Sequence, residues 1–242
     1  MCTIATMLRL TKFTVLALVA SFALPAATAA AQSSSQAKPA GQYVGEAAKP
    51  ADQILADAVT AMGHLKDFHV AGQAASDGVT VGLNLSVSNS GGGGSVREFG
   101  ATINLVTTSE FSYMKAGAAS WQALTHDATM AQMLANRWLQ VHTSDPQYES
   151  FSRLTFSGKF LALFVADPGH LSKVGMGAAD GRSAIVITND LGSKYYVAAY
   201  GAPYLLEFSS GNALASETLR MTDFGGAPMP TIPVNSVAIP GF

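Results

Sequence analysis

The 242-residue chain contains little charge and a single cysteine. Charged residues make up 12% of it and hydrophobic residues 48%. Because Cys2 precedes the first apolar run, we expect no disulfide and no thiolate metal site in the rest of the chain. With 14 basic and 16 acidic residues and no basic cluster, the composition argues against nucleic acid as a partner and against docking on an anionic membrane.

The sequence also lacks familiar catalytic and metal-binding motifs. Its five histidines show neither HxH nor HExxH spacing, and no serine lies in a G-x-S-x-G elbow. The run Gly91 to Gly94 is not followed by GK[ST], so it predicts a hairpin loop rather than a phosphate cradle. We therefore expect no cofactor, no metal and no enzymatic activity. A hydrolase whose nucleophile and base meet only in the fold is an alternative that the sequence leaves open.

The first residues have the pattern of a secretory signal. Arg9 and Lys12 precede an apolar run at 13–24, and small residues with Ala-x-Ala spacing follow. We expect residues 1–31 to be a cleaved signal peptide, 32–49 a flexible Ala/Ser/Pro linker and 50–242 one domain. Ala27 stands where a lipoprotein signal would need cysteine, so no acyl anchor is expected. The expected location is secreted or extracytoplasmic, in the cell envelope.

The periodicity of apolar residues predicts both helices and strands. A helix is expected from Pro50 to Gly63, and residues 79–88 alternate strictly, as in a half-buried strand. Strands between 65 and 115 form a predicted antiparallel meander, and further strands follow between 182 and 224. The segments 127–136, 146–152 and 157–166 are predicted helices, the last of them apolar on nearly every side and hence buried. The predicted fold class is α+β, with a single strongly curved antiparallel β-sheet, an unclosed half-barrel, wrapped around short α-helices.

Five segments have an informative order and spacing, although each is only loosely apolar with a Trp, Tyr or Pro. They are FHVAGQ at 68–73, FSYMKAGAASW at 111–121, LANRWLQVHTSDPQYESFSRLT at 134–155, KYYVAAYGAPYLLEFSS at 194–210 and LRMTDFGGAPMPTIP at 219–233. Together they resemble the LolA-like bacterial carriers, nearest the actinobacterial LppX/LprG-type envelope lipoproteins. The resemblance implies an unclosed barrel with helices inside, and an apolar cavity that binds acyl chains. The chain departs from those relatives at the missing lipobox cysteine.

The buried faces of the predicted strands would form the concave wall of such a cavity. The candidate ligand-binding residues are Val81, Leu83, Leu85, Ile103, Leu105, Phe111 and Tyr113 on the wall, and Trp138, Phe160 and Phe164 on the strand and helix that cap it. Ordinary core packing explains each of them equally well.

The expected function is binding of lipid, glycolipid or lipoprotein acyl chains, for transport or sequestration, by a monomer that exchanges cargo with a membrane donor or acceptor protein. The alternative is a non-enzymatic envelope sensor or protein-interaction module of the same fold. A large continuous apolar cavity would favour the carrier, and a filled core with an exposed apolar patch would favour the interaction module.

Overall fold

The computed structural model describes residues 45–76, 79–98, 100–166, 168–211 and 215–238. The expected signal peptide and residues 32–44 of the expected linker lie outside these ranges. The remaining linker residues include a short 3₁₀ helix, η1 (Glu46–Ala48), directly before the first α-helix. That helix is α2 (Ala51–Gly63), and Pro50 is its N-cap, as the sequence predicts.

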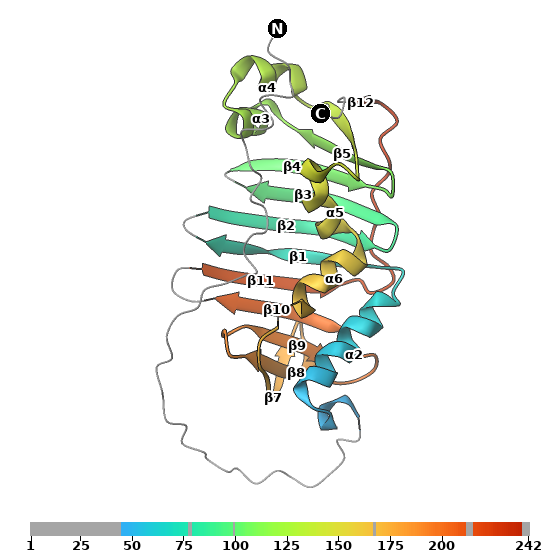
Figure 1. Ribbon diagram of the computed structural model, residues 1–242, viewed down its shortest axis with the longest axis vertical. Coiled ribbons are helices and arrows are strands. Elements are labelled where there is room, and N and C mark those ends of the chain that lie inside the picture. Colours follow the sequence, from blue (N-terminus) through green and yellow to red (C-terminus); the bar gives the residue numbers. More distant parts are fainter. Residues whose placement is uncertain (1–44, 77–78, 99, 167, 212–214, 239–242) are drawn as a thin grey trace.

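One sheet holds all the described strands, stacked in Figure 1 like the rungs of a ladder. The strands are β1 (Asp67–Ser76), β2 (Val79–Ser88), β3 (Gly91–Glu98), β4 (Ala101–Thr107), β5 (Phe111–Ala116), β6 (Trp138–His142), β7 (Leu171–Ala179), β8 (Arg182–Asn189), β9 (Lys194–Ala198), β10 (Leu205–Gly211), β11 (Ala215–Thr222) and β12 (Ser236–Ala238). Their order is β12-β6-β5-β4-β3-β2-β1-β11-β10-β9-β8-β7. Since β12 and β7 lie at opposite ends, the sheet is unclosed, and the predicted α+β half-barrel is confirmed.

The sheet is mixed rather than wholly antiparallel. Every neighbouring pair runs antiparallel except β12 and β6, which run parallel with Val237 opposite Leu139. The proline-rich tail ends in β12, which forms one edge of the sheet. The tail reaches β6 by crossing from the middle of the sheet, held on the way by hydrogen bonds from Ala227 N to Asp67 Oδ1 and from Ser86 Oγ to the carbonyl of Pro228.

Short helices cover one face of the sheet (Figure 1). Besides α2 they are α3 (Ala118–Thr125), α4 (Ala128–Leu134), α5 (Glu149–Thr155) and α6 (Ser157–Val165), with a 3₁₀ turn, η2 (Pro146–Tyr148), before α5. Helices α2 and α6 lie over the middle and lower strands, and α3 and α4 lie at the β5 end. We call the covered side the helix face.

Two apolar clusters fill the space between the helices and the sheet. The first joins α2 and α6 to β1, β2 and β8–β11, and its largest fully buried members include Phe68, Ile54 and Phe160. The second joins α3 and α4 to β4–β6, with Trp121 and Met114 in its interior. Helix α5 connects them, because Phe151 belongs to the second cluster and Leu154 to the first.

The glycine run at 91–94 was predicted as a hairpin loop, and this prediction is wrong. The turn is at Asn89 and Ser90, and the glycines form the start of β3 between β2 and β4. Their missing side chains allow very close packing of the neighbouring strands. A Cβ built on Gly93 would lie 2.1 Å from the carbonyl oxygen of Leu105 and 2.9 Å from the Cα of Val106.

We expect Gly93→Ala to destabilise the protein by roughly 1–3 kcal/mol, because the new methyl group meets backbone that cannot move aside. Gly82→Ala on neighbouring β2 is the matched control, since its Cβ would come no nearer than 3.6 Å to Arg97 Cβ. Urea unfolding of the two variants provides the measurement. Equal midpoints for both would contradict the close-packing account.

Candidate functional site

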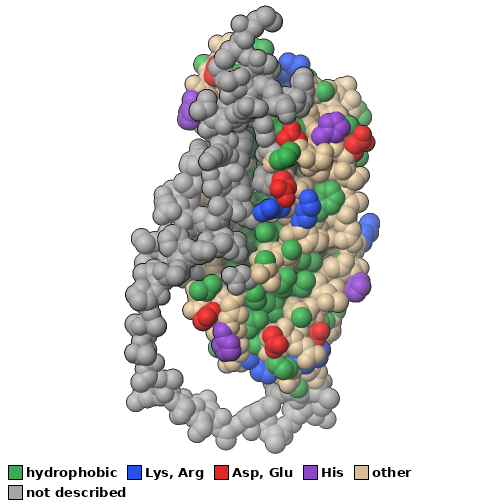
Figure 2. Space-filling view, in the orientation of Figure 1, with side chains coloured by type: hydrophobic (Ala, Val, Ile, Leu, Met, Phe, Trp, Pro, Cys, Tyr) green, Lys and Arg blue, Asp and Glu red, His purple; other side chains and the backbone are tan. Residues whose placement is uncertain are grey.

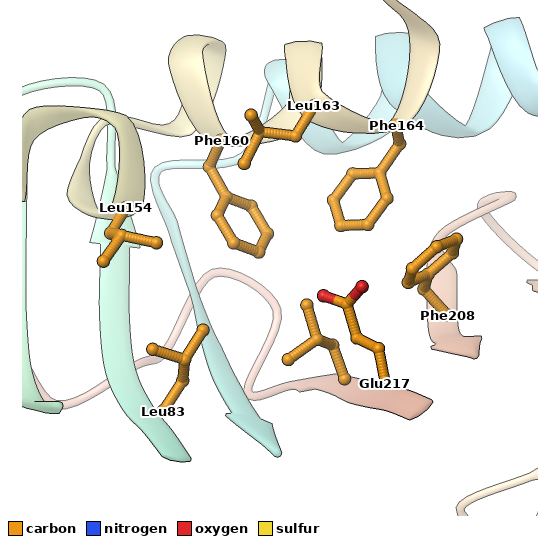
Figure 3. Close-up of a pocket in the computed structure, with 8 residues that line it drawn as sticks. Leu83, Leu154, Phe160, Leu163, Phe164, Phe208 and Glu217 are labelled. Carbon is orange, nitrogen blue, oxygen red and sulfur yellow. The ribbon is translucent and has the colours of Figure 1, made fainter. Parts of the chain in front are cut away.

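A small cavity lies between α6 and the helix face of the sheet (Figure 3). Its volume is about 20 Å³, which is enough for one water molecule. Seven of its eight lining side chains are apolar: Leu83, Leu154, Phe160, Leu163, Phe164, Phe208 and Leu219. The eighth is Glu217 of β11, whose carboxyl group points into the cavity. The structure therefore does not contain the large continuous apolar cavity that would favour a carrier.

The roof of the cavity is attached to the sheet at one end only. The backbone of Phe156, between α5 and α6, forms a parallel bridge with Ser88 at the end of β2. Next to it, the Ser157 hydroxyl donates a hydrogen bond to Asn89 Oδ1. Within the described residues, no hydrogen bond joins residues 160–165 to a strand, and this part of α6 rests on the sheet through apolar contacts such as Phe164 against Phe208, with ring centroids 5.1 Å apart.

Aromatic rings line the contact between α6 and the sheet. Phe160 lies 6.0 Å from Phe68 and 5.4 Å from Phe164, and Phe208 continues the series to Tyr195 at 5.1 Å, all measured between ring centroids. Tilted and edge-on geometries of this kind stabilise by dispersion and quadrupole interactions without requiring a single rigid fit. Figure 2 shows hydrophobic side chains gathered in the lower half of this face.

Glu217 is an unusual side chain for such a place. Burial raises the pKa of its carboxyl group to about 7. Glu217 is opposite Ala74 of β1, and Ala74 is opposite Val81 of β2, which packs against the first cluster, so Glu217 lies on the helix face. Val81 is in turn opposite Glu98 of β3. Two carboxylates thus occupy one cross-strand row, about 14 Å apart at ~4.8 Å per strand. Burial also raises the pKa of Glu98, which is not among the cavity-lining residues.

The ten candidate residues named from the sequence divide into three groups. Leu83, Phe160 and Phe164 line the cavity. Leu85 belongs to the first cluster and Val81 packs against it. Ile103 and Leu105 lie in the second cluster, around α3 and α4. The wall proposed from the sequence is therefore divided between two cores on one face of the sheet.

Phe111, Tyr113 and Trp138 lie on the opposite face, so their expected place in the wall is wrong. Met114 is opposite Leu105 and faces the second cluster, and strand alternation turns Tyr113 and Phe111 away from it. Phe111 instead contacts His142 at 4.8 Å between ring centroids, and the Lys115 ammonium lies 5.8 Å from the centroid of the Trp138 ring. In β5 both alternating sets contain large side chains, so periodicity alone assigns them to the wrong face.

Glu217 is not among the site residues predicted from the sequence, although a signal for it is present. Leu219 and Met221 share its parity in β11, and both are buried on the helix face. A single acidic residue in register with an apolar set indicates a carboxyl group that faces the core. No group of three or more metal-ligating side chains occurs within the described ranges. Likewise, no helix in those ranges is long and apolar enough to cross a membrane.

Comparison with solved structures finds similar chains at low sequence identity. The chain is similar to lipoprotein LppX from Mycobacterium tuberculosis, with 14% identity, a TM-score of 0.48 and coverage of 73% of this chain and 97% of that one. It is similar to LprF from Mycobacterium bovis, with 13% identity, a TM-score of 0.49 and coverage of 75% and 96%. A LolA superfamily protein from Nitrosomonas europaea follows at 10% identity, a TM-score of 0.22 and coverage of 75% and 96%.

No protein-family model and no curated protein matches the sequence. The function is therefore inferred from the cavity and its side chains.

The raised pKa of Glu217 predicts a pH-dependent stability. Between its ordinary pKa of 4.5 and about 7, the unfolded chain has lost this proton while the folded protein keeps it. Stability is therefore lost as the pH rises through this window. We expect Glu217→Gln to match the wild type at pH 5 and to be more stable by about 2 kcal/mol at pH 8.

Urea unfolding at the two pH values measures this difference, with Glu110→Gln as the control because that side chain is exposed. A stability gain of Glu217→Gln that is the same at pH 5 and pH 8 would show that Glu217 is not the titrating group.

Proposed function

We propose that the protein binds the acyl chain of a lipid or lipoprotein between α6 and the sheet. The observation that carries the proposal is the cavity of seven apolar side chains beneath a helix whose far half rests on the sheet through apolar contacts. Outward rotation of α6 about Phe156 would separate these surfaces and extend the cavity along the first cluster. The acyl chain then replaces the ring contacts that α6 makes when the cavity is closed.

The free energies favour such an exchange. Burying about 14 methylene groups at ~0.8 kcal/mol each contributes roughly 11 kcal/mol. Withdrawing Phe160, Leu163 and Phe164 from the sheet costs at most about 9 kcal/mol, at ~2–3 kcal/mol for each large apolar side chain. Because the bound chain recovers part of that contact, a net gain of several kcal/mol remains. This suits reversible uptake and release better than permanent storage.

The proposal is of a binding protein for transport or sequestration, acting as a monomer that exchanges cargo with a membrane donor or acceptor protein. Glycolipids are included among its ligands. Its expected location outside the cytoplasm follows from the sequence of residues 1–31 and stays a prediction, as does the boundary of the domain at residue 50.

We expect Leu163→Trp to weaken binding of a long-chain acyl probe at least tenfold, because the indole would occupy the cavity from α6. Val165→Trp is the matched control, since Val165 lies on the same helix, is 38% exposed and does not line the cavity. Binding is measured by native mass spectrometry of delipidated protein titrated with the probe, and melting temperatures verify that both variants fold. Absence of any acyl binding, or an equal loss in both variants, would overturn the proposal.

A second candidate function is protein interaction along β7, which forms one end of the sheet. Val174 and Met176 on this strand are 64% and 46% exposed, which is unusual for large apolar side chains in a strand. An end strand with free backbone groups can pair with an extended segment of a partner protein. The Lys173 ammonium already binds the carbonyl oxygens of Ala47 and Lys49, at 2.6 and 3.2 Å, and this supports the strand from the N-terminal side.

If this second function holds, a photo-crosslinker at Val174 should give a discrete adduct with a native partner. The same group at Tyr200 is the control, because Tyr200 is 67% exposed but lies in the loop after β9. Crosslinking in cells followed by mass analysis is the measurement. Identical adduct patterns at both positions would exclude β7 as a specific interface.

A further inference from the structure

Glu217 supplies the polar chemistry of an otherwise apolar cavity. Figure 3 shows its carboxyl group directed between Phe164, Phe208 and the leucines that complete the lining. Within the part of the chain that the structure describes, no hydrogen bond or ion pair of this carboxyl group is present. Glu217 is half-buried, and a carboxyl group shielded from water without a protein partner costs free energy, so its position favours a partner that arrives with the ligand.

The groups around Glu217 leave it without a counter-charge. Burial, and after it the negative charge of Glu217, raises the pKa of the Tyr195 hydroxyl group on β9. The charged side chains on the other elements packed around the cavity are engaged elsewhere or lie on the opposite face. On the helices, Lys159 donates a hydrogen bond to Ser152, Arg153 to Glu149, and Lys49 to Asp57. On the strands, alternation places Lys194 and Glu207 on the opposite face, where Glu207 pairs with Arg220. Glu98 lies three strands away in the same cross-strand row.

We propose that Glu217 recognises the polar end of the bound lipid by hydrogen bonding to a neutral ester or hydroxyl group. The ligand class is thus a neutral acyl ester, such as an acylglycerol or a glycolipid, rather than a free fatty-acid anion. This inference rests on the proposed acyl-chain binding.

The chemistry follows from the apolar lining. In these surroundings the carboxyl group is mostly protonated below neutral pH, so its O–H donates to an ester carbonyl and its C=O accepts from a hydroxyl. A fatty-acid anion would have to lose its hydration at the same place without a cation to balance it. Ionisation of Glu217 removes the donor and places a negative charge beside the ester oxygen, so binding of the ester weakens as the pH rises.

The test compares four probes that carry the same chain length. They are glycerol monopalmitate, palmitate, hexadecane and hexadecylamine, delivered from cyclodextrin to the delipidated full-length protein. Competition at pH 6 and pH 8, followed by native mass spectrometry, gives the relative affinities. The wild type should prefer the monoacylglycerol to hexadecane and to palmitate by about tenfold at pH 6, the effect of one hydrogen bond, and should lose most of that preference at pH 8.

Two substitutions and a control separate recognition from folding. Glu217→Leu should bind hexadecane while losing the preference for the ester, and Glu217→Gln should keep a preference that no longer changes with pH. Glu98→Gln is the matched control, because it removes a buried carboxyl group in the same row outside the cavity. It should behave as the wild type in both the preference and its pH dependence.

The failures of the two proposals are distinguishable. If no probe binds, including hexadecane, acyl binding itself is wrong and this inference falls with it. If all probes bind but Glu217→Leu keeps the wild-type preference, acyl binding stands and the recognition role is overturned. A preference of the wild type for hexadecylamine would also overturn the inference, because Glu217 would then act as a carboxylate for a cationic head group.

Discussion

The requirement to cover one apolar face of an unclosed sheet governs this structure. The sheet buries large side chains from β1, β2 and β8–β11 on one side, and no second sheet covers them within the described residues. The chain meets this requirement with helices α2 and α6, whose contacts with the strands are apolar. Such contacts are strong in sum but weakly directional, so the covering layer can shift without breaking a hydrogen-bonded ladder.

Much of this arrangement is predictable from the sequence, because its signals are local. Period-two alternation in β2 and the helical face of α2 with Ile54, Ala58 and Met62 identify elements that the structure confirms. The order of the segments indicates the half-barrel. By contrast, strand β7 was missed, since its exposure follows no simple alternation, and Gly175 and Gly177 interrupt it.

The parts that could not be predicted depend on contacts between distant residues. The glycines of β3 look like a loop until two neighbouring strands are placed against them. Tyr113 and Met114 are both large, and only pairing with β4 decides which of them faces the core. The size of the cavity depends on how far α6 settles onto Phe208, which no local pattern encodes. For these reasons the group of apolar residues was foreseeable, and the division between two clusters was not.

The tail that crosses the sheet has a further consequence. By pairing with β6, β12 replaces a five-residue end strand with one of three residues, preceded by Pro233. The opposite end, β7, stays long and open. Growth of a fibril by head-to-tail addition of copies needs two complementary ends, and a short strand beside proline is a poor template for the next copy. We therefore expect the β12 end to resist the addition of further copies, even though the β7 end is exposed.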